Sequence, residues 1–204
     1  GRVYISPSGH WVQSGSLEDA LSPTIETAIA DRLKGVSSEE RQVLDVLAVA
    51  GGEGDYDLLE RILKQTDPSL LAIVDNLLNL GLVVEPRDIN STELRLAHDL
   101  YREVLDKTLP KARKRVIQIQ IAEAMLALGQ DSDRFAHQLA RYFHEGGDDS
   151  KALPFALAAG NYALRQYLPQ RALRHYMNVL SWQGQSGDVN QSKVETIKAW
   201  VGIG

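Results

Sequence analysis

The period of the apolar residues changes at Gly81, and this change constrains the fold more than any other feature of the sequence. Between residues 38 and 80, apolar side chains recur at every third or fourth position in three successive segments, which is the spacing of amphipathic helices. Beyond Gly81, residues 82–85 and 93–96 predict two strands on either side of a polar loop. The chain is therefore expected to place a small β-hairpin after a group of helices.

Residues at the ends of the predicted helices support the same prediction. Ser37 and Glu40 have the spacing of a capping box, in which each side chain satisfies a backbone N–H at the start of a helix. Gly51 and Gly81 are suited to end helices, because glycine readily adopts the left-handed conformation. Three helices followed by a β-hairpin predict a winged helix-turn-helix domain over residues 22–109, after a short β or linker segment over residues 1–21.

The remaining chain predicts helices almost throughout. Small residues and tyrosines recur there with a spacing of 20 residues, so that Tyr142 aligns with Tyr162 and Ala152 aligns with Ala172. Such repeats are typical of helical arrays, in which each unit buries its apolar face only against its neighbours. We therefore expect a mainly α chain in which residues 110–204 form a TPR-like superhelical repeat array.

Composition excludes several classes of protein. The chain has 22 Lys and Arg residues against 27 Asp and Glu residues, a net charge of −5, so the chain as a whole is not expected to bind nucleic acid. It has no cysteine, which excludes disulfides and thiol chemistry and favours a cytoplasmic location. No apolar run reaches the roughly 18 residues of a membrane span, so no membrane partner is expected.

The sequence does not predict an enzyme. A glycine-rich phosphate-binding loop followed by Lys and Ser or Thr is missing, so the chain alone is expected to bind no nucleotide cofactor. The five histidines form no pair at i, i+3 or i, i+4, and no metal site is expected. Both ends of the sequence interrupt a predicted element, and we interpret the chain as a fragment of a longer cytoplasmic protein.

The charge of the winged-helix segment indicates whether it would bind DNA. Residues 37–97 contain five basic and twelve acidic residues, a local balance of −7. The helix over residues 68–80, which would enter the major groove, has no Lys or Arg and carries Asp75. Asn76 and Asn79 are candidate donors to bases, but they would lie in a repulsive field. We therefore expect this domain to contact protein, and direct nucleic-acid binding is not expected.

A histidine and an aspartate, His98 and Asp99, stand where the second strand gives way to a helix. An aspartate is electrostatically favoured at a helix N-terminus. An imidazole at this place either caps or packs against the helix, or it donates a hydrogen bond to a phosphate oxygen. The residue types alone leave both alternatives open.

Several runs resemble bacterial signal-transduction ATPases of the STAND class, which include LuxR-type and MalT-like transcriptional regulators and ATPase modules attached to adenylate cyclases. The runs include SEERQVL at residues 38–44, LLNLGLV at 77–83 and LAHDLYREVL at 96–105, and a further stretch covers 139–176. Their order resembles the region just after the nucleotide-binding domain of that class. The resemblance covers roughly residues 22–182.

The resemblance implies roles for both parts of the chain. In that class the winged-helix domain packs on the ATPase core and helps to hold the closed, ADP-bound state. In related apoptotic and plant-immunity ATPases, a Met-His-Asp motif supplies a histidine to the ADP β-phosphate, and Ala97-His98-Asp99 falls at the matching place with Ala for Met. The resemblance thus implies that His98 is a cofactor-binding residue in the full-length protein, and that helices after Pro110 form a sensor arm.

These expectations combine into a regulatory fragment of a STAND-type signalling ATPase and transcriptional regulator. Its winged helix would stabilise the ADP-bound inactive state on the protein's own upstream nucleotide-binding domain, which would bind ADP or ATP. Its helical repeats would sense an inducer or a protein partner. The alternative is a DNA-binding winged-helix transcription factor with a helical ligand or dimerisation domain, and a third hypothesis is a protein-interaction scaffold without nucleotide coupling.

Overall fold

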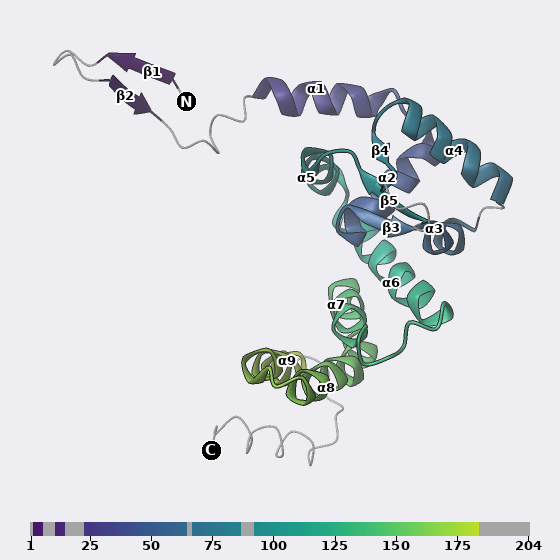
Figure 1. Cartoon of the computed structure of the whole chain (residues 1–204), viewed down its shortest axis with the longest axis vertical. Helices are drawn as coiled ribbons and strands as arrows, with labels where there is room; N and C mark the ends of the chain where they lie inside the picture. Colours follow the sequence, from purple (N-terminus) through teal and green to yellow (C-terminus); the bar gives the residue numbers. More distant parts are fainter. Residues whose placement is uncertain (1, 6–10, 15–22, 65–66, 87–91, 184–204) are drawn as a thin grey trace. The chain divides into compact units, whose positions relative to one another are not determined.

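The computed structural model describes residues 2–5, 11–14, 23–64, 67–86 and 92–183 (Figure 1). These residues form nine helices and five strands, which confirms the expectation of a mainly helical chain with a small antiparallel sheet. The chain divides into two compact units. Unit 1 comprises residues 1–53 and 68–108, and unit 2 comprises residues 54–67 and 109–204. The domain limits of 1–21, 22–109 and 110–204 stay predictions.

The elements follow in this order: β1 (Arg2–Ile5), β2 (Trp11–Ser14), α1 (Pro23–Lys34), α2 (Ser38–Ala50), β3 (Glu53–Asp55), α3 (Tyr56–Leu63), α4 (Asp67–Asn79), β4 (Val83–Val84), β5 (Glu93–Leu96), α5 (Asp99–Thr108), α6 (Lys111–Ala127), α7 (Ala136–Gly146), α8 (Asp149–Arg165) and α9 (Pro169–Gln183). Strands β1 and β2 pair antiparallel. Within the described ranges, no helix is long and apolar enough to cross a bilayer. The loop and helix predicted beyond Gln183 lie outside the described residues.

The start of α2 confirms the predicted capping box. The Glu40 N–H donates to Ser37 Oγ at 3.1 Å, and the Ser37 N–H donates to Glu40 Oε2 at 2.7 Å. Both bonds satisfy backbone donors that a helix start leaves without intrahelical partners. The helix ends at Gly51, where φ is +111°, and α2 packs against α5 of the same unit. These local signals are why α2 begins and ends where the sequence predicts.

The small sheet has the strand order β3-β5-β4. Its hairpin pairs Val83 with Leu96 in the antiparallel direction, as the change of period at Gly81 predicts. Gly81 ends α4 with a φ of +63° and so turns the chain into β4. Strand β3 was not predicted from the sequence. The Leu96 N–H donates to Gly52 O at 2.8 Å, immediately before β3, and thereby extends the sheet beyond the hairpin.

Unit 2 is a succession of helices in which each packs on the next, from α6 through α7 and α8 to α9, while α3 packs on α6 (Figure 1). The predicted 20-residue spacing corresponds to one helix and its turn, since Tyr142 lies on α7 and Tyr162 lies on α8. Ala152 and Ala172 are both almost fully buried, at 0% and 1% exposure. Small residues at these positions allow neighbouring helices to approach each other closely.

Candidate functional site

The sequence places its one candidate binding residue, His98, at the elbow between β5 and α5 of unit 1. The Ala97 N–H donates to Leu82 O at 2.9 Å, which fixes the end of the hairpin. The Tyr101 N–H donates to His98 O at 3.0 Å and begins the hydrogen-bond pattern of α5. His98 is therefore held on both sides by regular structure, and its ring is exposed to solvent.

The His98 ring caps α5. Its Nδ1 accepts the backbone N–H of Leu100 at 3.2 Å, which satisfies one of the free donors at the helix start. A ring nitrogen that accepts an N–H bond carries no proton, so the proton of the neutral imidazole lies on Nε2. The capping role that the sequence left open is thus present, and it leaves Nε2–H as the donor that an incoming acceptor would meet.

Buried side chains and hydrogen bonds hold helix α5, which follows His98, in place. Tyr101 is buried, and its hydroxyl accepts a hydrogen bond from Arg32 Nη1 at 2.9 Å. A second nitrogen of the same guanidinium donates to Leu80 O, at the end of α4. Val104 and Leu105 complete the buried face of α5. A binding group on such a helix keeps its position better than one on a loop.

Arg102 lies one turn after His98 and is the nearest basic residue along α5. His98 precedes the first residue of α5, and Arg102 is an exposed residue of its first turn. The Arg102 stem passes beside Gly52, where an added Cβ would lie 3.6 Å from Arg102 Cδ. An imidazole and a guanidinium are each suited to bind an oxyanion such as a phosphate, whereas Asp99, the residue after His98, is an exposed carboxylate.

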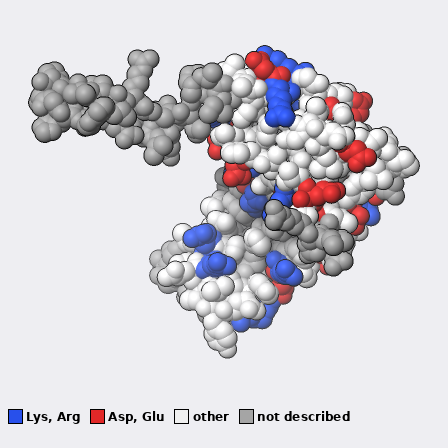
Figure 2. Space-filling view, turned by 45° about the horizontal axis from the view of Figure 1, so that its top comes forward, with Lys and Arg blue, Asp and Glu red and all other residues white. Residues whose placement is uncertain are grey.

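Helix α4 is the helix that would enter the major groove of DNA, and one of its two asparagines forms a hydrogen bond within unit 1. Asn76 Nδ2 donates to Glu40 Oε1, which joins α4 to α2. Glu40 is only 6% exposed, so its carboxylate depends on this amide as well as on the backbone of Ser37. Figure 2 shows acidic and basic side chains interspersed over the visible face, without one continuous basic surface. Neither observation provides the continuous basic surface with which a protein binds the phosphates of a DNA duplex.

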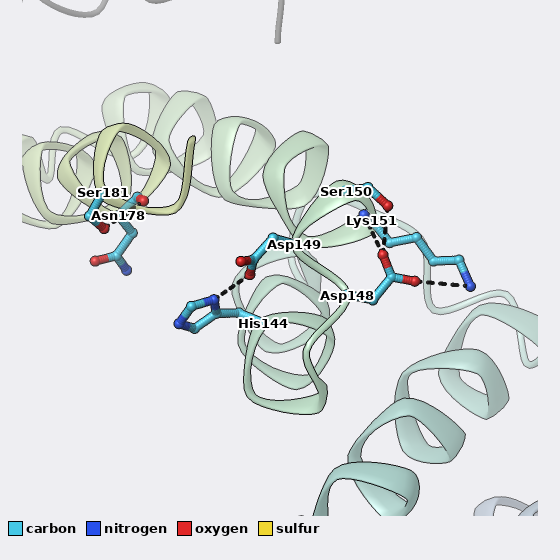
Figure 3. A network of polar contacts seen from close by, with 7 residues as sticks. All are labelled: His144, Asp148, Asp149, Ser150, Lys151, Asn178 and Ser181. Atoms are coloured by element: carbon cyan, nitrogen blue, oxygen red, sulfur yellow. Dashed lines mark hydrogen bonds and ion pairs between the residues drawn. The ribbon is translucent and has the colours of Figure 1, made fainter. Parts of the chain in front are cut away.

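A second polar cluster lies at the turn between α7 and α8 (Figure 3). His144 Nδ1 lies 2.5 Å from Asp149 Oδ1, and the His144 ring stacks on Trp182 with 3.9 Å between centroids. An oriented histidine of this kind also occurs in nucleophilic catalysis, which requires a hydroxyl beside the ring. Ser181, on the nearby part of α9, donates its Oγ to Asn178 O at 2.9 Å instead. The cluster therefore joins three helices and offers no activated nucleophile.

Asp148 fixes the start of α8 in the same cluster. Its carboxylate accepts the Lys151 N–H at 3.1 Å and the Ser150 hydroxyl at 2.6 Å (Figure 3). The hydroxyl bond, more than any other contact, holds the pKa of Asp148 below its usual value. These bonds are those of an N-cap, so Asp148 stabilises the start of α8.

Two histidines that the sequence left apart come together in unit 2. His137 on α7 and His175 on α9 line one pocket with Arg171 and Arg174. Histidine spacing within one helix does not indicate this cluster, because His137 and His175 belong to different helices. The sequence does carry a signal for this cluster, which is the run Arg-x-x-Arg-His at residues 171–175. Its basic side chains have helical spacing, and the first turn of the helix has no acidic residue.

Within the described residues, no group of three or more His, Asp or Glu side chains is arranged to hold a metal ion. Comparisons with protein-family models, curated proteins and solved structures gave no match for this chain. The candidate sites are therefore the His98 elbow of unit 1 and the basic pocket of unit 2.

Proposed function

We propose that the chain is a regulatory segment of a STAND-type signalling ATPase, in which residues 22–109 stabilise an ADP-bound inactive state and the helices after Pro110 sense a ligand or partner. In this proposal residues 22–109 act as a winged helix that docks on an upstream nucleotide-binding domain. The helices α6–α9 act as a TPR-like sensor. The proposal rests first on the resemblance of residues 22–182 to that class.

One observation from the molecule supports the proposal above the others. The His98 ring is exposed at the start of α5, and its Nδ1 already accepts a hydrogen bond from the Leu100 N–H. Its free donor is Nε2–H, which is the group that would bind a β-phosphate oxygen. Arg102, in the first turn of α5, would add positive charge to the same end of the helix.

The regulatory step would be a shift between two populations. A ligand that binds the open state more tightly than the closed state favours release of ADP, and its effect is limited by that difference in affinity. The contact between His98 and ADP would contribute to the stability of the closed state. Loss of the contact would therefore raise the basal activity without any ligand.

The test measures ADP release from the longer protein with His98 replaced. A hydrogen bond to a charged group contributes about 1.5–3 kcal/mol, so His98→Ala should accelerate ADP release by about tenfold or more. His98→Asn is the matched variant, because Asn is a good N-cap but does not present the Nε2–H donor. Faster release in both variants supports the proposal. Unchanged ADP release in both variants would show that His98 does not contact the nucleotide.

A further inference from the structure

The basic pocket of unit 2 has a volume of about 390 Å³. It is lined by the turn before α7, by α7 and α8, and by the start of α9. Small-molecule sites in proteins typically have volumes of about 300–1,000 Å³. The pocket is therefore large enough for a small organic ligand and too small for a folded partner.

Five basic side chains converge on this pocket, namely Arg134, His137, Arg171, Arg174 and His175. The pocket also contains one carboxylate, Asp133, but this carboxylate pairs with Arg165. In the described part of the chain, no carboxylate is paired with Arg171 or Arg174. The residues that the structure describes thus leave the positive charge of Arg171 and Arg174 without a paired carboxylate.

The arrangement on α9 opposes the stability of the helix. Arg171 and Arg174 are three residues apart, where like charges repel each other across one turn. The first turn of α9 has no acidic residue, although negative charge is the sign favoured at a helix N-terminus. A local arrangement that opposes stability, and that no described residue compensates, is typical of a functional site. A bound anion would compensate both effects.

The walls of the pocket combine charge with an apolar surface. Ala159, Ala163 and Leu168 contribute aliphatic atoms, and the Tyr162 ring lies beside them. Guanidinium groups match the geometry of a phosphate and bind it through paired N–H donors. An apolar wall beside such donors suits the carbon skeleton that carries the phosphate. The lining therefore favours an organic phosphate over a bare inorganic ion.

We propose that this pocket binds a small phosphorylated organic molecule, with Arg171 and Arg174 on the phosphate and with His137 and His175 as further donors. The presence of the site does not depend on the function proposed above. Its role as the inducer site of the sensor does rest on that proposed function. Binding and regulation are therefore measured separately.

Binding of an anion should change the protonation of His175, which lies partly buried among the positive charges of the pocket. Burial, followed by the charges of His137, Arg174 and Arg171, lowers the pKa of His175 below its usual value. A bound phosphate would favour the charged imidazole and raise that pKa. Anion binding should then be accompanied by proton uptake near neutral pH, which calorimetry in buffers of different ionisation enthalpy detects.

The experiment measures binding of glucose 6-phosphate and of pyrophosphate to this chain by calorimetry, with sulfate as a control anion. Arg174→Gln removes one charge from the pocket, and Lys151→Gln removes one exposed charge from α8 outside it. We expect saturable binding of the sugar phosphate that Arg174→Gln weakens about tenfold, since a charge-assisted bond contributes that much. Lys151→Gln should change the affinity less than twofold.

Several results would overturn this site. Equal weakening by the two variants would indicate general attraction by charge, and equal affinity for sulfate would indicate an unselective anion surface. No saturation at about 10 mM sugar phosphate would exclude a site of useful affinity for an organic phosphate, and saturation by pyrophosphate alone would contradict the role given to the apolar wall. Both variants replace exposed side chains, and thermal unfolding verifies that they fold. Binding without any effect on ADP release would leave the site intact and remove only its regulatory role.

Discussion

A Cβ atom added to Gly160 on α8 would lie 2.4 Å from Cε1 of Tyr176 on α9, so the tyrosine ring packs directly on the glycine backbone. The Tyr176 ring is buried, and its hydroxyl donates to Asn161 Oδ1 at 2.7 Å. Two consecutive residues of α8 therefore fix the face and the hydroxyl of one ring. This contact sets how closely the two helices approach.

Gly160→Ala should destabilise the chain by up to about 2 kcal/mol. Overpacking costs about 1–3 kcal/mol, and the gain in helix propensity of about 1 kcal/mol offsets only part of it. Thermal unfolding should show a Tm lowered by several degrees. Gly146→Ala is the comparison, because its new Cβ would meet Cδ1 and Cγ1 of Ile119 at 2.6 and 2.7 Å and the Arg115 carbonyl oxygen at 3.3 Å. The Ile119 side chain is only half-buried and can change rotamer, so this substitution should destabilise less. A stabilised Gly160→Ala variant would contradict the packing of α8 on α9.

The 20-residue spacing predicted a helical repeat, because small residues are a local signal of close helix packing. It could not identify Gly160 as the tightest position, since that depends on a ring from the following helix. In the same way, the cap of α2 follows from two side chains three residues apart. Such features can be read from neighbouring residues without knowledge of the tertiary structure.

Features made by distant segments were harder to predict. Strand β3 has no alternation of apolar residues, and the sheet reaches it through Gly52 and Leu96, which are far apart in the chain. The basic pocket joins His137 to residues of α9 that follow more than a helix later. His98 was found because it stands at a change of period, but its bond to the Leu100 N–H required the backbone geometry.

The bond between Asn76 and Glu40 predicts a selective effect of substitutions on α4. Asn76→Ala removes a donor from a carboxylate that is almost fully buried, and such a loss costs about 1–3 kcal/mol. Urea unfolding of the chain should report this decrease. Asn79→Ala changes an exposed residue of the same type on the same helix and should alter stability by no more than about 0.5 kcal/mol. Equal effects of the two substitutions would argue against the contact.

The cap formed by His98 predicts a stability effect that is independent of any nucleotide. His98→Ala should destabilise the chain by about 1 kcal/mol, because the Leu100 N–H loses its acceptor. Hydrogen exchange at the Leu100 amide should become faster in the same variant. His98→Asn should retain most of the stability, since asparagine accepts a bond from the same kind of backbone donor. Equally fast exchange in the parent chain and in His98→Ala would contradict the cap.

The charged groups that face His175 across the pocket predict a dependence of stability on pH. These groups are Asp133, Arg134, His137, Arg171 and Arg174. Burial is the largest cause of the lowered pKa of His175, so the unfolded chain takes up a proton at this ring before the folded chain does. The contribution of His175 is therefore present above its ordinary pKa of about 6.5 and is lost as the pH falls through its lowered folded value.

Thermal unfolding between about pH 5 and pH 8 measures this contribution, because that range includes the ordinary pKa of histidine. The Tm of the parent chain should fall toward acid pH, and His175→Asn, which does not titrate there, should reduce the slope. Saturating sugar phosphate should oppose the fall, because the anion favours the protonated ring. Identical slopes for the parent chain and His175→Asn would mean that this imidazole is not desolvated in the folded state. If a sugar phosphate stabilises His175→Asn and the parent chain equally at acid pH, the His175 ring does not interact with the bound anion.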